Sequence, residues 1–215
     1  MPKGCSNPGH GGRDSGAVGK RSLEKDINLQ VSLKFAKRMR ELGFEMSETR
    51  TADAFVSLSE IAAIANRSVS DFFQSNHCNA GGGRGFEIYA LPGGKAEQWA
   101  RIMEKHLAAA LGLVDRGVKT NQNYYVLVHT NMPAILVELA FIDNPGEEEL
   151  LLNLAWQEKA VEAMAQAWCE VFSVTYQPPR PVEPSPTTNG QNRDELVKQA
   201  LQCLDKLREV VEKLR

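Results

Sequence analysis

The run from Ala134 to Phe141 is apolar at every position except Glu138, and it constrains the fold more than any other part of the chain. A continuous apolar run of this length is typical of a strand that is buried within a sheet. An unpaired ionised carboxylate is strongly disfavoured in such an interior, so Glu138 must be paired, bind a metal ion or stay protonated. The run therefore predicts a buried strand and marks Glu138 as a candidate functional residue.

The rest of the chain alternates between strand and helix patterns. The sequence predicts strands over 3–7, 44–49, 71–76, 86–90, 124–128 and 134–141, and helices over 23–42, 58–66, 96–111, 147–153 and 155–171. This alternation is typical of an α/β domain with a central, mostly parallel or mixed sheet flanked by helices. In such sheets, sites lie at the carboxyl ends of strands and in the loops that follow them.

Three residues near these strand ends and helix starts are candidate metal ligands. His10 lies in a glycine-rich turn after the first predicted strand, His77 follows the third, and Glu24 opens the first long helix. Two histidines and one carboxylate can hold a catalytic zinc ion with one position open for water. Glu138 could then take the proton from that water. Taken singly, His10 fits an exposed turn residue better than a ligand, and Glu24 fits a carboxylate that complements the helix dipole better than a ligand.

Length and charge restrict the function class. The 215 residues suit one domain with an appendage, and the net charge of -2 argues against a nucleic-acid binder. No apolar stretch approaches the ~20 residues that span a bilayer, so we expect no membrane segment. The first residues lack the charged and apolar regions of a secretory signal peptide, which predicts that the protein is cytoplasmic at synthesis. No two cysteines have C-x-x-C spacing, and we expect reduced thiols.

The composition changes after residue 176. Residues 177–192 contain five prolines and predict a semi-rigid linker between a main domain over 1–176 and a C-terminal amphipathic helix over 193–215. Apolar residues in that helix recur three and four apart, the spacing of a coiled coil, at Val197, Ala200, Leu204, Leu207, Val211 and Leu214. Three interpretations stay open: a homodimer through this helix, binding of a cell-wall or protein partner, or packing on the main domain.

A series of short motifs runs through residues 3–173. The motifs include Pro8-Gly9-His10-Gly11-Gly12, Glu24-Lys25-Asp26-Ile27-Asn28, Thr49-Arg50-Thr51, Ile64-Ala65-Asn66, His77-Cys78-Asn79-Ala80, Gly85-Phe86-Glu87 and Met132-Pro133-Ala134-Ile135-Leu136-Val137-Glu138. In this order they resemble the zinc-dependent N-acetylmuramoyl-L-alanine amidases of the Amidase_3 family. The chain departs from the family pattern at Asn7, where Asp is common, at Ile61, where Arg is frequent, and in the polar stretch 73–76.

The resemblance implies an α/β fold and hydrolysis of the amide between the lactyl group of N-acetylmuramic acid and L-alanine in peptidoglycan. It places the zinc ligands at His10, Glu24 and His77, and the catalytic general base at Glu138. The candidate substrate-binding residues are Asn79, Arg84 and His129.

Alternative functions stay open beside the amidase. The same site chemistry would suit a zinc carboxypeptidase or another peptidase that cuts peptidoglycan stem peptides. A non-catalytic cell-wall-binding module is a third hypothesis, against which the intact ligand set and Glu138 argue. We expect a lytic enzyme that acts on the cell wall after release, as a phage endolysin does in its host, with a sporulation-type amidase as the alternative.

Overall fold

The computed structural model describes residues 1–120, 123–179 and 198 of the chain. Residues Met1–Gln177 form one compact unit. The predicted coiled coil and most of the predicted linker fall outside the described residues, so their organisation stays a prediction.

One mixed sheet forms the centre of this unit. Within the described residues it has six strands: β1 (Lys3–Pro8), β2 (Glu45–Glu48), β3 (Phe72–Asn79), β4 (Phe86–Ala90), β5 (Asp115–Thr120) and β6 (Ala134–Phe141). Their order across the sheet is β2-β1-β3-β6-β4-β5. All neighbouring strands run parallel except β4 and β6, which are antiparallel. The apolar run that contains Glu138 is thus an inner strand, β6, with β3 on one side and β4 on the other.

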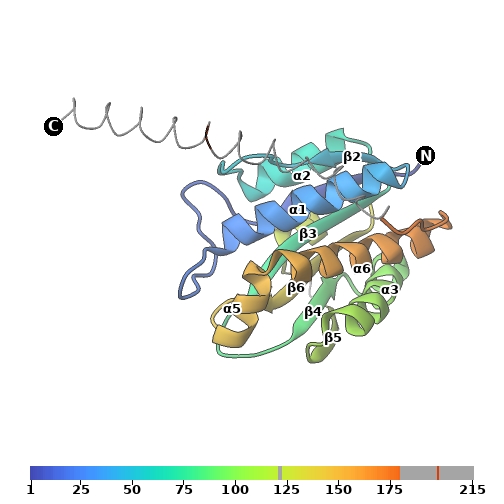
Figure 1. The fold of residues 1–215 in the computed structure, drawn as a ribbon. Coiled ribbons are helices and arrows are strands. Elements are labelled where there is room, and N and C mark those ends of the chain that lie inside the picture. Colours follow the sequence, from blue (N-terminus) through green and yellow to red (C-terminus); the bar gives the residue numbers. More distant parts are fainter. Residues whose placement is uncertain (121–122, 180–197, 199–215) are drawn as a thin grey trace. The chain divides into compact units, whose positions relative to one another are not determined.

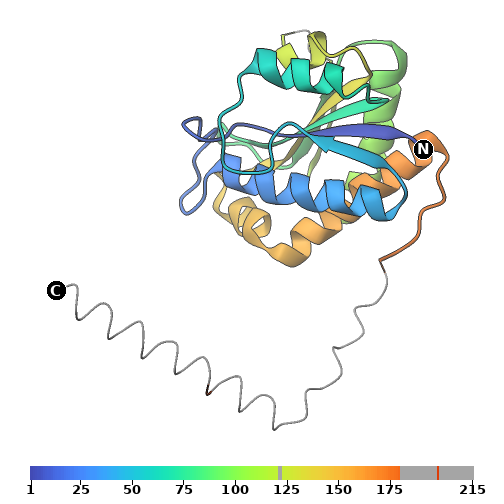
Figure 2. The same cartoon turned by 90° about the horizontal axis from the view of Figure 1, so that it is seen from above.

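Helices cover both faces of the sheet (Figures 1 and 2). They are α1 (Glu24–Glu41), α2 (Leu58–Arg67), α3 (Gly94–Leu111), α4 (Tyr125–Val128), α5 (Pro145–Leu152) and α6 (Leu154–Phe172). The long helices α1, α3 and α6 pack on one face, and the shorter α2 and α4 lie on the other, as the view from above shows. The α/β architecture with flanking helices is therefore confirmed.

The alternation of side chains along β6 divides the core in two. Ile135, Val137 and Leu139 point toward the long helices, whereas Ala134 and Leu136 pack toward α2 and α4. Because Glu138 shares the parity of Leu136, its carboxylate lies on the face that carries the shorter helices. That face has the smaller apolar cluster, which leaves room for a cleft.

Two segments were predicted wrongly. Residues 124–128 were expected to form a strand, but Tyr125–Val128 forms the short helix α4, and the ring of Tyr125 stacks on His129 one turn later with centroids 3.8 Å apart. Asn66 on α2 donates a hydrogen bond to the carbonyl of His129, so tertiary contacts outweigh the β-branched composition. The edge strand β5 was missed because its residues are half-buried or exposed and show no apolar alternation.

The polar stretch before His77 is fully buried, in spite of its composition. Gln74 donates to the side-chain oxygen of Asn76 at 2.8 Å and accepts a hydrogen bond from the indole of Trp168. Asn76 donates to Ser32 on α1 at 2.8 Å. A buried polar group is tolerated when its hydrogen bonds are made, which explains how this strand departs from the apolar pattern without loss of the fold.

The side chain of Trp168 on α6 connects the long helices to the sheet. It is 1% exposed and stacks on Phe72 of β3 with ring centroids 4.0 Å apart. We expect Trp168→Ala to lower the free energy of unfolding by about 3–5 kcal/mol, because it removes both the ring packing and the hydrogen bond to Gln74. Leu154→Ala on the same helix, at a position 63% exposed, should change it by less than about 0.5 kcal/mol in the same urea titration. Equal effects of the two substitutions would contradict this account of the core.

The proposed boundary of the main domain can be tested by truncation. A chain that ends after Tyr176 should unfold cooperatively and keep its metal site, because the sheet, its helices and all candidate ligands precede that residue. Circular dichroism and calorimetric zinc titration would check both expectations. An unfolded product, or one that binds no metal, would place the boundary elsewhere.

Candidate metal centre and active site

A cleft of about 530 Å³ opens at the carboxyl ends of β1, β3 and β6. Four of the residues that line it are His10, Glu24, His77 and Glu138. The first three come from the loop after β1, the first turn of α1 and the end of β3, and Glu138 comes from β6. The fold therefore brings together four residues that are spread over more than a hundred positions of the sequence.

The turn that carries His10 is fixed by the basic side chains around it. His10 itself has a positive φ of 61°, and backbone hydrogen bonds join Gly11 and Asp14 in both directions. Arg50 donates to the carbonyls of Pro8 and Gly9 at 3.1 Å each, and to the carbonyl of Lys25 at 2.8 Å. Burial of its guanidinium among these carbonyls lowers the pKa of Arg50. Arg50 thus holds the turn against the start of α1, a role the sequence motif alone did not show.

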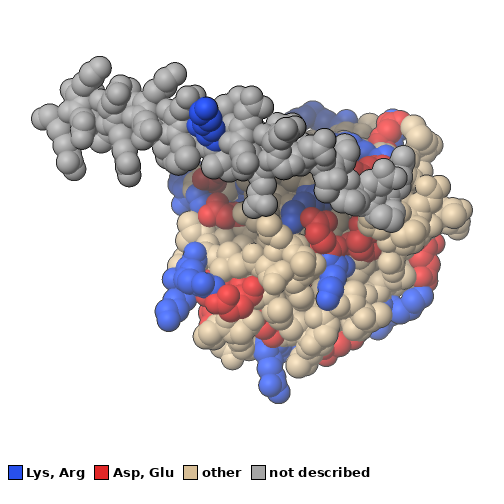
Figure 3. All heavy atoms as spheres, viewed as in Figure 1, with Lys and Arg blue, Asp and Glu red and all other residues tan. Residues whose placement is uncertain are grey.

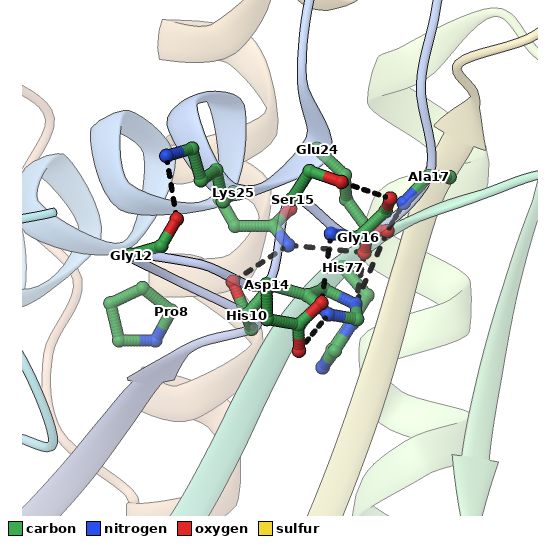
Figure 4. A network of polar contacts seen from close by, with 12 residues as sticks. Pro8, His10, Gly12, Asp14, Ser15, Gly16, Ala17, Glu24, Lys25 and His77 are labelled. Carbon is green, nitrogen blue, oxygen red and sulfur yellow. Dashed lines mark hydrogen bonds and ion pairs between the residues drawn. The ribbon is translucent and has the colours of Figure 1, made fainter. Parts of the chain in front are cut away.

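Glu24 is the centre of the cluster (Figure 4). Its Oε1 lies 2.9 Å from Nδ1 of His77 and accepts the backbone N–H of Cys78 at 3.1 Å. Its Oε2 lies 3.2 Å from Nε2 of His10 and accepts the backbone N–H of Ala17 at 2.7 Å. Both carboxylate oxygens therefore face a histidine nitrogen, and the donor atoms of the three residues lie within 4.8 Å of one another.

The outward nitrogens of both histidines also have partners. Nδ1 of His10 lies 2.9 Å from Asp14, and Nε2 of His77 lies 3.0 Å from the hydroxyl of Ser75. Ser75 in turn accepts a hydrogen bond of 2.7 Å from Asn7. Partners of this kind fix the orientation of ligand rings in metal sites. The asparagine that replaces the common aspartate at position 7 is thus a support for Ser75.

The charges of the cluster favour a protonated His10 and an ionised Glu24. Burial works to lower the pKa of His10, but hydrogen bonds and charges from Glu24 and Asp14 outweigh it and raise this pKa to about 9. Burial works to raise the pKa of Glu24, but both histidines hold it well below its usual range. An ionised carboxylate flanked by two imidazoles is a suitable ligand set for a divalent cation. A bound cation would take the place of the protons that lie between the imidazoles and the carboxylate.

Glu138 faces the cluster from the neighbouring strand. It is the cross-strand partner of His77 on β3 and of Glu87 on β4. It is 9% exposed, and its Oε2 is buried with no hydrogen-bond partner among the described residues. Burial is the main cause that raises its pKa to about 7. A carboxyl group with this pKa and a free oxygen in a cleft can accept and return a proton near neutral pH.

The three candidate substrate-binding residues have different surroundings. Asn79 lines the cleft, where its amide donates to Glu87 at 2.7 Å and its oxygen accepts the N–H of Ala80 at 2.8 Å. Arg84 is exposed in the loop after β3 and is outside the cleft lining. His129 is exposed behind Tyr125, whose ring lines the cleft in its place.

Sequence reasoning missed the second wall of the cleft. It is formed by apolar and aromatic residues of the loop before α2, of α2 itself and of the start of α4, namely Phe55, Val56, Leu58, Ile61, Tyr124, Tyr125 and Val126. In a sequence these residues look like core residues. Phe55 and Leu58 differ from the core in their exposure, 42% and 56%, which a sequence does not show.

The chain is similar to known amidases over most of its length. The family model described as N-acetylmuramoyl-L-alanine amidase, Amidase_3, matches residues 6–170. The chain belongs to this amidase family. The amidase CwlM of Bacillus licheniformis is 36% identical over 79% of this chain and 68% of its own length. The endolysin of Bacillus phage SPP1 is 36% identical over 77% of this chain and 64% of its own length.

A solved amidase structure has the same fold. The catalytic domain of the amidase CwlV from Bacillus (Paenibacillus) polymyxa var. colistinus superimposes with a TM-score of 0.78 at 31% identity. It covers 81% of this chain and is itself covered completely. The chain is therefore a peptidoglycan amidase of a metal-dependent family, and the group of His10, Glu24 and His77 is where a metal ion fits.

Close packing in the turn supplies a test of this metal centre. A Cβ atom at Gly9 would lie 2.2 Å from Cε1 of His77, so the methyl group of Gly9→Ala must displace that ring. We expect the variant to fold but to bind Zn²⁺ about 10–100-fold more weakly in calorimetric titration. Gly146→Ala is the matched control, because its Cβ would lie at an ordinary 3.5 Å from Asn144. Unchanged zinc affinity in folded Gly9→Ala would contradict the assignment of His77 as a ligand.

Proposed function

We propose that this chain is a zinc-dependent hydrolase that cuts the amide between N-acetylmuramic acid and L-alanine, with Glu138 as its general base. The observation that supports this most is the convergence of His10, Glu24 and His77 beside a buried carboxyl group that has a free oxygen. A structural carboxylate would use both oxygens in hydrogen bonds, as Glu87 does with Asn79, Tyr89 and Arg116. Glu138 lines the cleft, and among the described residues one of its oxygens has no hydrogen-bond partner.

The donor set favours zinc over harder cations. His10 and His77 supply imidazole nitrogens and Glu24 supplies a carboxylate oxygen, a set that suits zinc better than the all-oxygen sites of calcium or magnesium. When bound, zinc acidifies a water molecule and polarises a carbonyl group. Asp14 and Ser75 would keep the two rings in their ligating orientation.

Glu138 would transfer the proton in both halves of the reaction. With its pKa raised to about 7, it accepts a proton from the attacking water and then delivers it to the amine of L-alanine as the amide breaks. The amine would otherwise be a poor leaving group. The apolar wall opposite limits the access of bulk water and so keeps this proton exchange within the cleft.

The biological role is a proposal that depends on the relatives. We propose a lytic, endolysin-like role on the cell wall, which the 36% identity to the endolysin of phage SPP1 supports. Peptidoglycan is the proposed partner. In the described part of the chain, no helix has both the length and the hydropathy of a membrane span. The C-terminal helix, and with it the proposed homodimer, lies outside the described residues.

One experiment tests the bond that is cut, the metal and the base together. Purified sacculi digested by the protein should release stem peptides that carry a free L-alanine amine, detected by mass spectrometry, and a chelator should stop the release. Glu138→Gln and Glu138→Ala should each retain zinc but release peptides about 10²–10⁴-fold more slowly, because the proton acceptor is lost.

Glu60→Gln on the exposed side of α2 is the control and should release peptides at the normal rate. Cuts between amino acids of the stem would favour the peptidase alternative. Binding to sacculi without release, in the zinc-loaded protein, would favour the non-catalytic module.

A further inference from the structure

Phe55 is an exposed aromatic residue at the cleft that is nevertheless held firmly. It lines the cleft and is 42% exposed. Two positions before it in the chain, Asp53 accepts hydrogen bonds from the backbone of Gly12 and from Lys25, both at 2.7 Å. The contact with the His10 turn is tight, since a Cβ atom at Gly12 would lie 2.6 Å from the nitrogen of Phe55. Phe55 and the turn of His10 therefore form one preorganised unit.

Arg13, at the tip of that turn, is stacked on the ring of Phe55. The central carbon of its guanidinium lies 4.0 Å from the ring centroid. Among the described residues the side chain of Arg13 is exposed and has no ion pair, whereas Lys25, which contacts the same turn through Gly12, is paired with Asp53. Stacking orients a planar guanidinium and leaves its N–H edges free for a carboxylate.

Arg13 lies within reach of a peptide whose scissile bond is placed at the metal centre. Arg13 is three positions after His10 in the chain, so their Cα atoms are at most about 11 Å apart. The side chain of the second residue beyond a scissile bond lies about 7 Å along an extended peptide. A charge carried by that residue would thus come within reach of Arg13 when the bond is placed at the cluster.

The electrostatics of the cleft favour such a cation for an acidic peptide. Asp14, Glu24 and Glu138 all line the cleft; the histidines and a bound metal ion would offset the charge of Glu24, whereas the carboxylate of Glu138 would repel a second negative charge. Phe55, Val56 and Leu58 offer apolar contacts to the uncharged parts of a ligand but no compensating charge. Arg13 lies outside the lining of the cleft, but it stacks on Phe55, which belongs to that lining, and it has no ion pair among the described residues.

We propose that Arg13, held by Phe55, recognises a free carboxylate on the stem-peptide residue that follows L-alanine, and that it makes the enzyme prefer acidic over amidated stems. This inference rests on the proposed function. In stem peptides that second residue is a glutamate joined through its side-chain carboxyl, so its α-carboxyl group is either a free carboxylate or a primary amide. The two forms differ in charge and hardly in shape, so charge recognition alone separates them.

A competition within one wall preparation tests the proposal. Sacculi whose stems are partly amidated at the second residue are digested for short times, and chromatography with mass spectrometry gives the ratio of the two released peptides. That ratio, divided by their ratio after complete digestion, equals the ratio of their kcat/KM values. We expect the native enzyme to favour the carboxylate form by roughly tenfold, as a hydrogen-bonded ion pair provides.

Variants locate the preference. Arg13→Gln should lower the ratio to about one by slowing release of the carboxylate form alone, and Arg13→Lys should keep part of it. Arg101→Gln, which removes an exposed arginine paired with Glu97 on α3, should retain the native ratio. A native enzyme without preference, or an Arg13→Gln variant that slows both forms equally, would overturn the proposal while leaving the amidase intact. Failure to release either peptide would instead overturn the proposed function.

Discussion

The buried carboxylate of Glu24 is the interaction on which the site depends. It binds the backbone of the loop before α1 at Ala17 and the backbone of β3 at Cys78, and it faces both histidines. Glu24 is 3% exposed, so these partners replace the water that would otherwise solvate its charge. Asn28 donates a further hydrogen bond to it at 3.1 Å. Removal of any partner would leave a buried charge without compensation, which is far more costly than the net gain from one hydrogen bond. The same residue therefore connects three segments and prepares the ligand set.

The mixed sheet places the reacting groups around this carboxylate. Because β6 lies between β3 and β4, the residues opposite Glu138 are His77 on one side and Glu87 on the other. Glu87 is satisfied by Arg116, Asn79 and Tyr89, each at 2.7 Å. Among the described residues, Oε2 of Glu138 has no hydrogen-bond partner. Two carboxylates on adjacent strands thus have different surroundings: Glu87 is fixed in a network, and Glu138 keeps an unpaired oxygen, as the proposed general base requires.

The sequence predicted those helices and strands whose burial leaves a periodic pattern of apolar residues, and it failed where no such pattern exists. The long helices and the apolar strands were predicted because burial on one face or on both leaves a period in the sequence, as in α1 with Ile27, Val31, Phe35 and Met39. The strand β5 leaves no such period because it lies at the exposed edge of the sheet. The segment of α4 has the composition of a strand, and only its contacts with α2 decide that it is helical.

The sequence by itself determined the α/β class, and it predicted the candidate ligands. It also marked Glu138 as unusual, because a carboxylate in an apolar run has few physical explanations. It also determined the family, through motifs that keep their order. Only the tertiary structure decided that Arg50 holds the His10 turn, that Ser75 supports His77, and that Arg13 lies over Phe55 at the lip of the cleft. These contacts join residues from separate loops and strands, and their distances depend on how the sheet stacks its strands, which no local pattern encodes.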